Sequence, residues 1–271
     1  GLLLVLNLLM IKRFSLFGIP NQEVGTRLSF ISVGLWWGIF SIPLFAFVRE
    51  KRKNLPMPGG RGYVYQGFNK IYITFKKIKN FNELVKFLIS FLIYNDGIQT
   101  VVSMAVIFGR SALNLSTTTL IGTLLLIQFI GIPGSLIFGK LAERIGSKRT
   151  IFLTLIVWIG IVFYAYFMSG SLEFWILGGF VGLVLGGSQA ISRSLYGSLI
   201  PERNTAEFFG FFAISNKFAS IFGPLTFGVI ESITGNPRKS ILSVEIFFII
   251  GIILLNFVNV KKGLEQAKVV I

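Results

Sequence analysis

The chain contains no cysteine and no histidine. The first absence excludes disulfides and thiolate chemistry, and the second excludes Ser-His and Cys-His catalysis and histidine-ligated metal sites. Charge is also scarce, because only 14% of the 271 residues are charged, against about 25% in soluble domains. No Gly-x-x-x-x-Gly-Lys-Ser/Thr loop is present, so an ATP-driven pump is not predicted. We therefore expect no enzyme, no cofactor and no metal.

Apolar residues dominate instead, at 53% of the chain and a mean hydropathy of +0.76. A helix of about 20 apolar residues crosses a bilayer. Runs of that length lie at residues 28–48, 84–108, 118–139, 150–168, 172–192, 206–230 and 241–260. They predict an all-α polytopic membrane protein. The net charge of +15 then indicates cationic membrane loops, and no nucleic-acid partner is expected.

The chain begins inside a further apolar run. Leu2–Ile11 is too short to span a bilayer, and no basic flank precedes it, so a signal peptide is not predicted. We interpret this run as the end of an eighth span. We therefore expect upstream helices to be missing, so that the missing part of the same protein, the lipid bilayer and a small solute are the partners of this chain.

One connection, residues 49–83, is much longer than the others. It opens with the basic run Arg49–Lys53 and continues through the helix breakers of Pro56–Gly60. Beyond them, apolar residues recur at helical spacing opposite lysines. The apolar residues are Phe68, Ile71, Tyr72, Phe75 and Ile78, and the lysines are Lys70, Lys76, Lys77 and Lys79. The pattern predicts a basic amphipathic helix on an anionic lipid surface, and a solvated linker helix is the alternative.

Lysine and arginine alternate between the connections. Of the 26 such residues, 18 fall on the side that includes residues 49–86, 140–149 and 261–268. Because these residues concentrate on the cytoplasmic side of a membrane, we predict that this side is cytoplasmic. The C-terminal tail, residues 261–271, then lies in the cytoplasm.

The most specific motif is the short connection Gly139-Lys140-Leu141-Ala142-Glu143-Arg144-Ile145-Gly146-Ser147-Lys148-Arg149. Gly146 permits a tight turn, and Glu143 can pair with Arg144 or with a cation on the next helix. The pattern resembles the Gly-x-Leu-Ala-Asp/Glu-Arg-x-Gly-x-Lys/Arg-Lys/Arg loop of the major facilitator superfamily. The resemblance implies a cytoplasmic gate made of Gly139, Glu143, Arg144, Gly146, Lys148 and Arg149. A group of cations that only fixes orientation is the alternative.

The resemblance also numbers the helices of a major-facilitator-type bundle. Residues 1–48 become the end of helix five and helix six of an N-terminal half that is mostly missing. Residues 49–83 become the central cytoplasmic loop, and 84–260 the C-terminal six-helix half. The motif then falls between helices eight and nine. In such transporters, inverted repeats place the solute site near mid-membrane.

Two other stretches narrow the resemblance. They are Tyr94-Asn95-Asp96-Gly97-Ile98-Gln99-Thr100 and Gly186-Gly187-Ser188-Gln189-Ala190-Ile191-Ser192-Arg193-Ser194. Both look like signature stretches of the branch that contains the fungal vacuolar amino-acid effluxers and their uncharacterised bacterial relatives. The branch implies solute export and, for this chain, a bacterial cytoplasmic membrane.

Asp96 stands near the middle of an apolar run, where an ionisable side chain is costly unless it faces a partner or a water-filled path. Gln99 shares its helix face, and Asn95 is adjacent. Lys217 lies about as deep in the 206–230 span. We predict that Asp96 and Lys217 face one cavity, as an ion pair or as a proton-coupled switch. Asp96 could instead bind a substrate amine, and a static structural pair is the remaining alternative.

The 172–192 span supplies further candidates. Its glycines at four-residue spacing, Gly178, Gly182 and Gly186, predict close helix packing. Gln189 and Arg193 continue this helix to its cytoplasmic mouth, where Arg193 either anchors the helix at the interface or contacts an anion. Gln128 fits either a cavity or an interhelical hydrogen bond.

These patterns together predict a secondary transporter that exports amino acids or similar metabolites by alternating access, with proton coupling through Asp96. The alternative is a non-transporting membrane receptor or scaffold that retains the fold. Buried Asp96, Gln99 and Lys217 favour solute handling, because a scaffold gains nothing from their desolvation cost.

Overall fold

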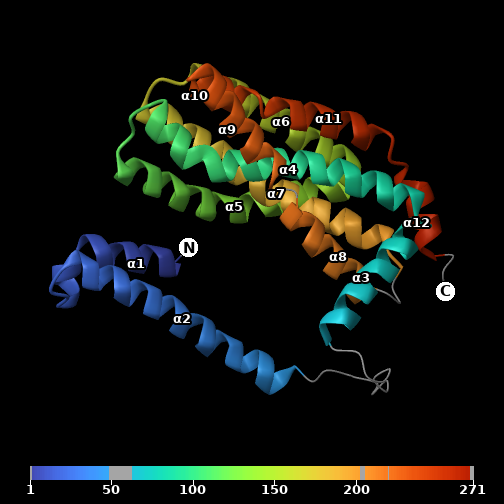
Figure 1. The fold of residues 1–271 in the computed structure, drawn as a ribbon, viewed down its shortest axis with the longest axis horizontal. Helices are drawn as coiled ribbons and strands as arrows, with labels where there is room; N and C mark the ends of the chain where they lie inside the picture. Colours follow the sequence, from blue (N-terminus) through green and yellow to red (C-terminus); the bar gives the residue numbers. More distant parts are fainter. Residues whose placement is uncertain (1, 49–62, 202–204, 219, 269–271) are drawn as a thin grey trace. The chain divides into compact units, whose positions relative to one another are not determined.

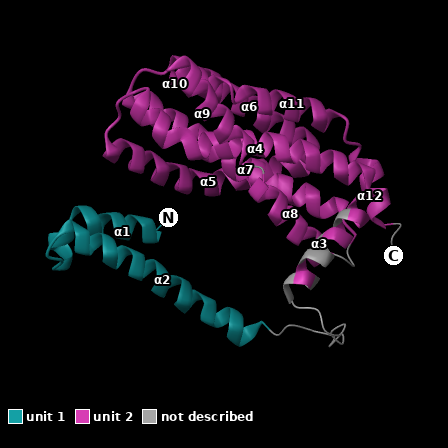
Figure 2. Cartoon of the chain, viewed as in Figure 1, with its two compact units in different colours: residues 1–61 teal, residues 62–271 magenta. Residues whose placement is uncertain are grey.

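The computed structural model describes residues 2–48, 63–201, 205–218 and 220–268, which are helical apart from short connections and contain no strand. The chain forms two compact units, residues 1–61 and 62–271 (Figures 1 and 2). Seven helical segments of the described residues are long and apolar enough to cross a membrane. The predicted all-α polytopic architecture is confirmed.

The first unit is a helical hairpin. It contains α1 (Leu2–Lys12), a 3-10 turn (Phe14–Phe17) and α2 (Gln22–Phe47). The side-chain oxygen of Asn21 accepts a hydrogen bond from Val24 N at 2.9 Å and so caps α2. Between the helices, Ser32 Oγ donates to Asn7 Oδ1 at 2.7 Å. A polar contact thus joins two otherwise apolar helices.

The second unit contains the other helices (Figure 1). They are α3 (Tyr63–Ile78), α4 (Asn82–Ser111), α5 (Thr117–Ile145), α6 (Ser147–Phe167), α7 (Ser171–Leu199), α8 (Thr205–Phe218), α9 (Phe222–Thr234), α10 (Pro237–Leu242), α11 (Glu245–Asn256) and α12 (Val260–Lys268). Long helices pack in pairs, with α5 along α7 and α4 along α11.

Helix α3 covers the segment predicted to be amphipathic. Ile78 is buried, whereas Tyr72 and Lys76 are exposed. The side chains of Phe68, Lys70, Ile71 and Phe75 lie outside the described residues, so the predicted lipid-binding face stays a prediction.

Two predicted spans are not single continuous helices. The 206–230 span is divided into α8 and α9, and the 241–260 span lies over α10 and α11. Pro224 explains the first division, because proline lacks an N–H and its ring clashes with the carbonyl four residues before it. Helix α9 therefore begins at Phe222 and holds Pro224 in its first turn, where no hydrogen bond is lost.

Glycines bring α5 and α7 into backbone contact, as their spacing predicts. A Cβ added at Gly182 would lie 2.8 Å from the carbonyl oxygen of Ile127, and one at Gly186 would overlap the carbonyl oxygen of Gly131. From the other side, a Cβ at Gly134 would overlap the carbonyl oxygen of Leu183. Helices without side chains at the contact can approach closely in lipid.

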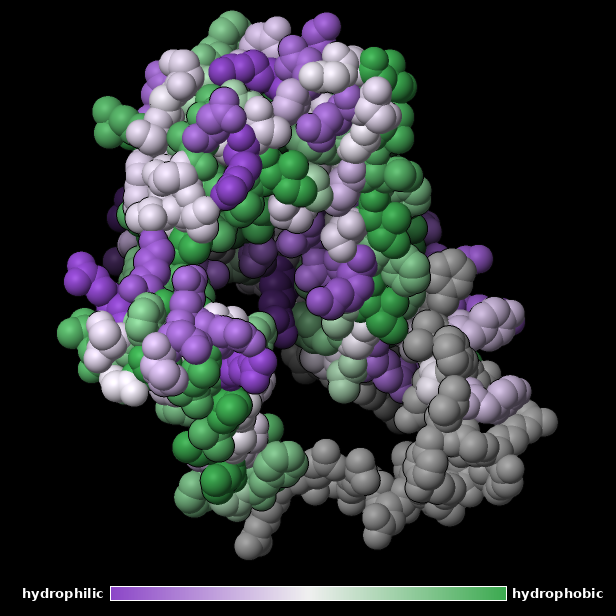
Figure 3. Space-filling model, turned by 60° about the vertical axis from the view of Figure 1, so that its left-hand side comes forward, coloured by the Kyte–Doolittle hydropathy of each residue, from purple (hydrophilic) through white to green (hydrophobic). Residues whose placement is uncertain are grey.

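The outer faces of α6 and α11 are apolar. After the first turn of α6, its exposed residues are Leu153, Ile156, Gly160, Phe163, Tyr164 and Phe167. On α11 they are Ile246, Ile249, Ile250 and Ile253, followed by the terminal Asn256. Hydrophobic side chains, drawn in green, cover much of the surface seen in Figure 3, with hydrophilic ones, drawn in purple, among them. Apolar faces of this length identify α6 and α11 as lipid-facing.

The glycine contact predicts a position-specific loss of stability. Gly186→Ala should lower the free energy of unfolding by about 1–3 kcal/mol, because its Cβ has no room beside the Gly131 backbone. Unfolding of the purified protein in detergent measures this loss. Gly160→Ala is the control, since a Cβ there meets nothing within 4 Å. Equal stability of the two variants would contradict the assigned contact.

Candidate functional site

Consecutive residues of α4 connect this helix to its neighbours. Successive side chains on a helix point about 100° apart, so Tyr94 and Asn95 reach different helices. The hydroxyl oxygens of Tyr94 and of Ser192 on α7 are 2.7 Å apart. Asn95 Nδ2 donates to Oδ1 of Asn216 on α8 at 2.6 Å. The two signature stretches found in the sequence therefore meet through the Tyr94–Ser192 hydrogen bond.

Asp96, the next residue, caps α9. Its Oδ2 accepts a hydrogen bond from the backbone N–H of Gly223 at 3.0 Å. Gly223 lies in the first turn of α9, where backbone N–H groups have no partner within the helix. A carboxylate at this end also interacts favourably with the helix dipole. The cap of α9 is thus supplied by another membrane helix.

The second carboxylate oxygen of Asp96 is unsatisfied. Asp96 is only 2% exposed, and its Oδ1 has no hydrogen-bond partner among the described residues. An unpaired buried carboxylate oxygen costs free energy. Oδ2 therefore has a structural partner, whereas Oδ1 has none among the described residues.

Gly223 is required for the close approach of α9 to α4. A Cβ on Gly223 would overlap the hydroxyl oxygen of Thr100 and lie 2.9 Å from the carbonyl oxygen of Asp96. That hydroxyl donates to the same carbonyl at 2.6 Å. Any larger residue at position 223 would separate the N-terminus of α9 from its cap.

Lys217 is not the partner of Asp96. Its side chain is exposed on the last turn of α8, and the described residues contain no ion pair between the two. The reason is geometric: the preceding residue, Asn216, is the one that contacts α4, and the next side chain on a helix points elsewhere. The ion pair is therefore absent, whereas a shared cavity and a proton-coupled switch stay predictions.

The other predicted residues take no part in these hydrogen bonds. Gln99 is half-buried and Gln189 exposed, and neither bonds to another described residue. The exposed Arg193 holds its guanidinium 5.5 Å from the ring centroid of Phe209. Gln128 is exposed and makes no interhelical hydrogen bond with the described residues.

The exposed amide and ammonium side chains inside the described spans of the second unit include residues on three helices. Gln128 belongs to α5, Gln189 to α7, and Asn216 and Lys217 to α8. By contrast, α6 and α11 expose only apolar residues between their ends. The second unit, residues 62–271, therefore exposes large polar side chains on α5, α7 and α8 and apolar faces on α6 and α11.

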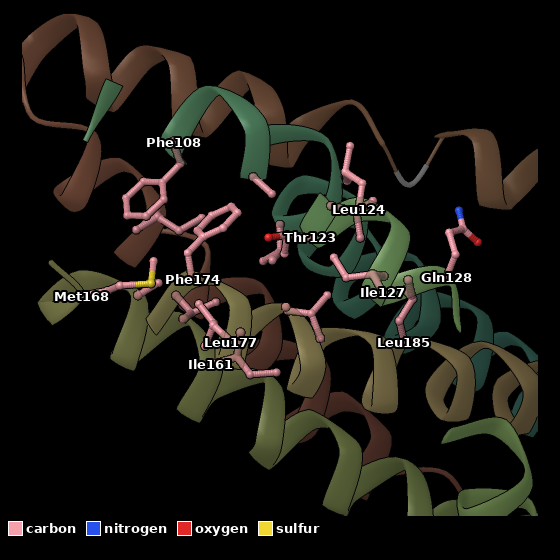
Figure 4. A pocket seen from close by; sticks show the side chains of 18 residues that line it. Phe108, Thr123, Leu124, Ile127, Gln128, Ile161, Met168, Phe174, Leu177 and Leu185 are labelled. Atoms are coloured by element: carbon pink, nitrogen blue, oxygen red, sulfur yellow. The ribbon is translucent and has the colours of Figure 1, made fainter. Parts of the chain in front are cut away.

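An apolar cavity of about 120 Å³ lies beside this region, enclosed by α4–α7 and Ile241 of α10. Figure 4 shows Phe108, Phe174 and Met168 at one end and Gln128 at the other. The hydroxyl of Thr123 points to the cavity but already donates to the carbonyl of Thr119 at 2.9 Å. The cavity is lined mainly by apolar side chains and therefore suits an apolar group.

The predicted gate loop is a tight turn. Helix α5 ends at Ile145 and α6 begins at Ser147, with Gly146 between them at φ +91°, a conformation that favours glycine. Glu143 and Arg144 are exposed and form no ion pair with described residues. A Cβ on Gly139 would meet nothing within 4 Å, so packing does not require glycine there.

Lys148 is the residue of this loop that makes firm contacts. Its ammonium donates to the carbonyl oxygens of Asn256 at 2.9 Å and Val258 at 2.8 Å. These carbonyls lie at the C-terminus of α11, the negative end of the helix dipole. Lys148 therefore joins α6 to α11, whereas Arg149 is exposed.

Comparison with known proteins identifies the family. The family described as "Vacuole effluxer Atg22 like" matches residues 1–268. The chain belongs to this Atg22-like family.

Curated relatives agree with this assignment. An uncharacterized MFS-type transporter YxiO of Bacillus subtilis is 37% identical over 88% of this chain and 55% of its own length. Autophagy-related protein 22 of Yarrowia lipolytica is 28% identical over 89% of the chain and 46% of its own length. The protein of that name from Saccharomyces cerevisiae is 26% identical over 92% and 53%. This integral membrane chain thus spans about half the length of these relatives.

Sequence reasoning missed several polar residues of this Atg22-like chain. Asn216 and Ser192 were not singled out as partners of the signature residues. Glu83, 2% exposed at the start of α4, accepts from Asn259 N at 2.8 Å and from Lys86 Nζ at 2.9 Å. A carboxylate at the first turn of an apolar run was the available signal for Glu83.

Glu245 was also missed. It lies in the first turn of α11, and its Oε1 is buried without a partner among the described residues. An acid inside the 241–260 apolar run was a signal comparable to that of Asp96.

The Asp96 cap predicts different effects for two substitutions. Asp96→Leu should lower the free energy of unfolding by about 1–3 kcal/mol, because it leaves the Gly223 N–H unpaired. Asp96→Asn should lose less, since its amide oxygen can still accept that bond. Unfolding in detergent compares the two. Equal losses for Asn and Leu would show that the hydrogen bond does not stabilise α9.

Lys148 should matter more for stability than its neighbour. Lys148→Met should cost about 1–2 kcal/mol of unfolding free energy, because the α11 carbonyls lose a charged donor. Arg149→Met, at an exposed position, should change it by less than about 0.5 kcal/mol. Thermal unfolding in the same detergent tests the difference, and an equal effect at both positions would argue against the α11 contact.

Proposed function

We propose that this chain forms the C-terminal part of a secondary transporter that moves a small solute by alternating access. One observation carries the proposal. Polar side chains are exposed at membrane depth on α5, α7 and α8, while α6 and α11 expose apolar surface. Polar groups facing lipid are costly, and a water-filled path removes that cost. The helices that carry them would therefore line the solute path.

The complete transporter would contain further helices. The relatives are about twice as long as the matched segment, and the family's matched members include an MFS-type transporter. The additional length would supply an N-terminal half that closes the path against α5, α7 and α8. The excess of Lys and Arg at residues 140–149 and 261–268 favours a cytoplasmic position for this end and for the C-terminus, in a bacterial cytoplasmic membrane.

A proton is a better ligand for Asp96 than a substrate amine. Asp96 is 2% exposed and lies against the start of α9, so an amine would have to displace that helix. A proton needs only the unpaired Oδ1. We therefore assign Asp96 to proton coupling. We assign contacts with an amino acid or similar solute to the exposed Gln189, Arg193 and Lys217. The Arg193 guanidinium and the Lys217 ammonium can bind a carboxylate.

A membrane receptor or scaffold remains the alternative function. Such a protein would also retain the fold and the α9 cap. It would not need Lys217 or Gln189 exposed at membrane depth, because their desolvation brings a scaffold no benefit.

A flux experiment separates these functions. The complete protein is placed in liposomes and given labelled amino acids under an imposed pH gradient. Asp96→Asn should abolish gradient-driven accumulation but keep exchange of labelled for unlabelled solute, because it preserves the acceptor for Gly223 and removes the titrating oxygen. Ser103→Ala, on the same helix and exposed, is the control that should retain both activities.

Two results would contradict the proposal. Unchanged accumulation in Asp96→Asn would make Asp96 a structural cap only. No flux of any solute through a folded parent would favour the receptor or scaffold.

A further inference from the structure

A basic groove lies in the second unit, residues 62–271, where the α5–α6 turn and the α11–α12 junction lie together. It has a volume of about 610 Å³ and is formed by residues 145–149, at the α5–α6 turn, and 256–261, at the α11–α12 junction. Its cations are Lys148, Arg149 and Lys261, and no aspartate or glutamate is among the described residues that line it. The groove is therefore shaped and charged for an anion.

Lys148 fixes the geometry of the groove. Its ammonium is held by the carbonyl oxygens of Asn256 and Val258 at 2.9 and 2.8 Å. An ammonium has three N–H donors, so one remains for a ligand. Arg149 and Lys261 are exposed and bond to no other described residue. The groove thus contains Lys148, which is held in place by two carbonyl oxygens, and the exposed cations of Arg149 and Lys261.

The position of the groove identifies the source of the anion. It lies at the N-terminal end of α6 and the C-terminal end of α11, two helices whose exposed faces are apolar. Phe257, at the same end, lines the groove and is 64% exposed. A ligand here would meet cations at the helix ends and hydrocarbon-facing side chains along the helices. A phospholipid has this combination of an anionic phosphate and acyl chains, whereas a free phosphate does not.

We propose that this groove binds the phosphate headgroup of an anionic phospholipid, with the acyl chains along the exposed faces of α6 and α11. The guanidinium of Arg149 can donate two parallel hydrogen bonds to the phosphate. Lys261 and Lys148 add further positive charge to the groove. The bound lipid would join the α5–α6 turn to the α11–α12 junction, apart from the proposed solute path on α5, α7 and α8.

Native mass spectrometry of the purified protein tests this site. The parent should retain phosphatidylglycerol in preference to phosphatidylcholine. Arg149→Gln combined with Lys261→Gln should weaken phosphatidylglycerol binding about 30-fold, since each cation near anionic lipid contributes about fivefold. Both positions are exposed, so thermal unfolding without lipid should not change.

A matched control separates a groove from general positive charge. Lys140→Gln combined with Lys268→Gln removes the same charge from exposed positions outside the groove. It should change phosphatidylglycerol binding less than about threefold. Equal weakening in both double variants, or no preference of the parent for phosphatidylglycerol, would overturn the proposal. Binding of water-soluble glycerol phosphate as tight as that of the lipid would also overturn it, in favour of a soluble anion.

Discussion

The hydrogen bond between Asp96 and the N-terminus of α9 is the interaction on which the rest of the second unit, residues 62–271, depends. A bilayer offers no water to satisfy free backbone N–H groups, so a helix can break there only if another group takes them. Pro224 forces the break, and the Asp96 carboxylate accepts from Gly223 at 3.0 Å. A buried carboxylate and an uncapped helix N-terminus each cost free energy in a bilayer, and the hydrogen bond between them lowers both costs. Tyr94 and Asn95, the residues just before Asp96, extend the contacts of α4 to α7 and α8.

The two kinds of helix contact in this unit differ in how they can change. Helices α5 and α7 meet backbone to backbone at Gly182 and Gly186, where no side chain can rearrange. Helix α4 is joined to α7, α8 and α9 by side-chain hydrogen bonds that can be broken and remade, and it also packs closely against α9 at Gly223. We infer that α5 and α7 move together and that relative motion, where it occurs, takes place at the contacts of α4. Lys148 donates to carbonyl oxygens at and just after the C-terminus of α11, and so ties the N-terminal end of α6 to the C-terminal end of α11.

Much of the fold could be predicted from the sequence, but the partners of its polar residues could not. Apolar run length determines the spans, and Gly146 at φ +91° is the turn that its motif predicts. The glycine spacing on α7 likewise predicts its contact with α5. The pairing of Asp96 with Lys217 was wrong as an ion pair, because side-chain patterns contain no information on free backbone N–H groups. Pro224 can be recognised in the sequence as a helix breaker, yet only the three-dimensional arrangement shows that Asp96 of α4 caps the helix that follows. Asn216 and the Asn259 contact of Glu83 were missed for the same reason, because these partners are distant in sequence.

The unequal environments of the two Asp96 oxygens bear on how such a residue could couple to protons. If both oxygens were bonded to the protein, protonation would have to break a contact and would be opposed by the fold. If neither were, nothing would link the proton to a helix. Here Oδ2 contacts α9 and Oδ1 is unpaired. A proton on Oδ1 withdraws negative charge from the carboxylate that caps α9, and so weakens the charge–dipole part of that contact without removing the hydrogen bond. Under the proposed coupling, a change in protonation would act first at the break between α8 and α9, next to Asn216 and Lys217 on α8, a helix that carries exposed polar groups.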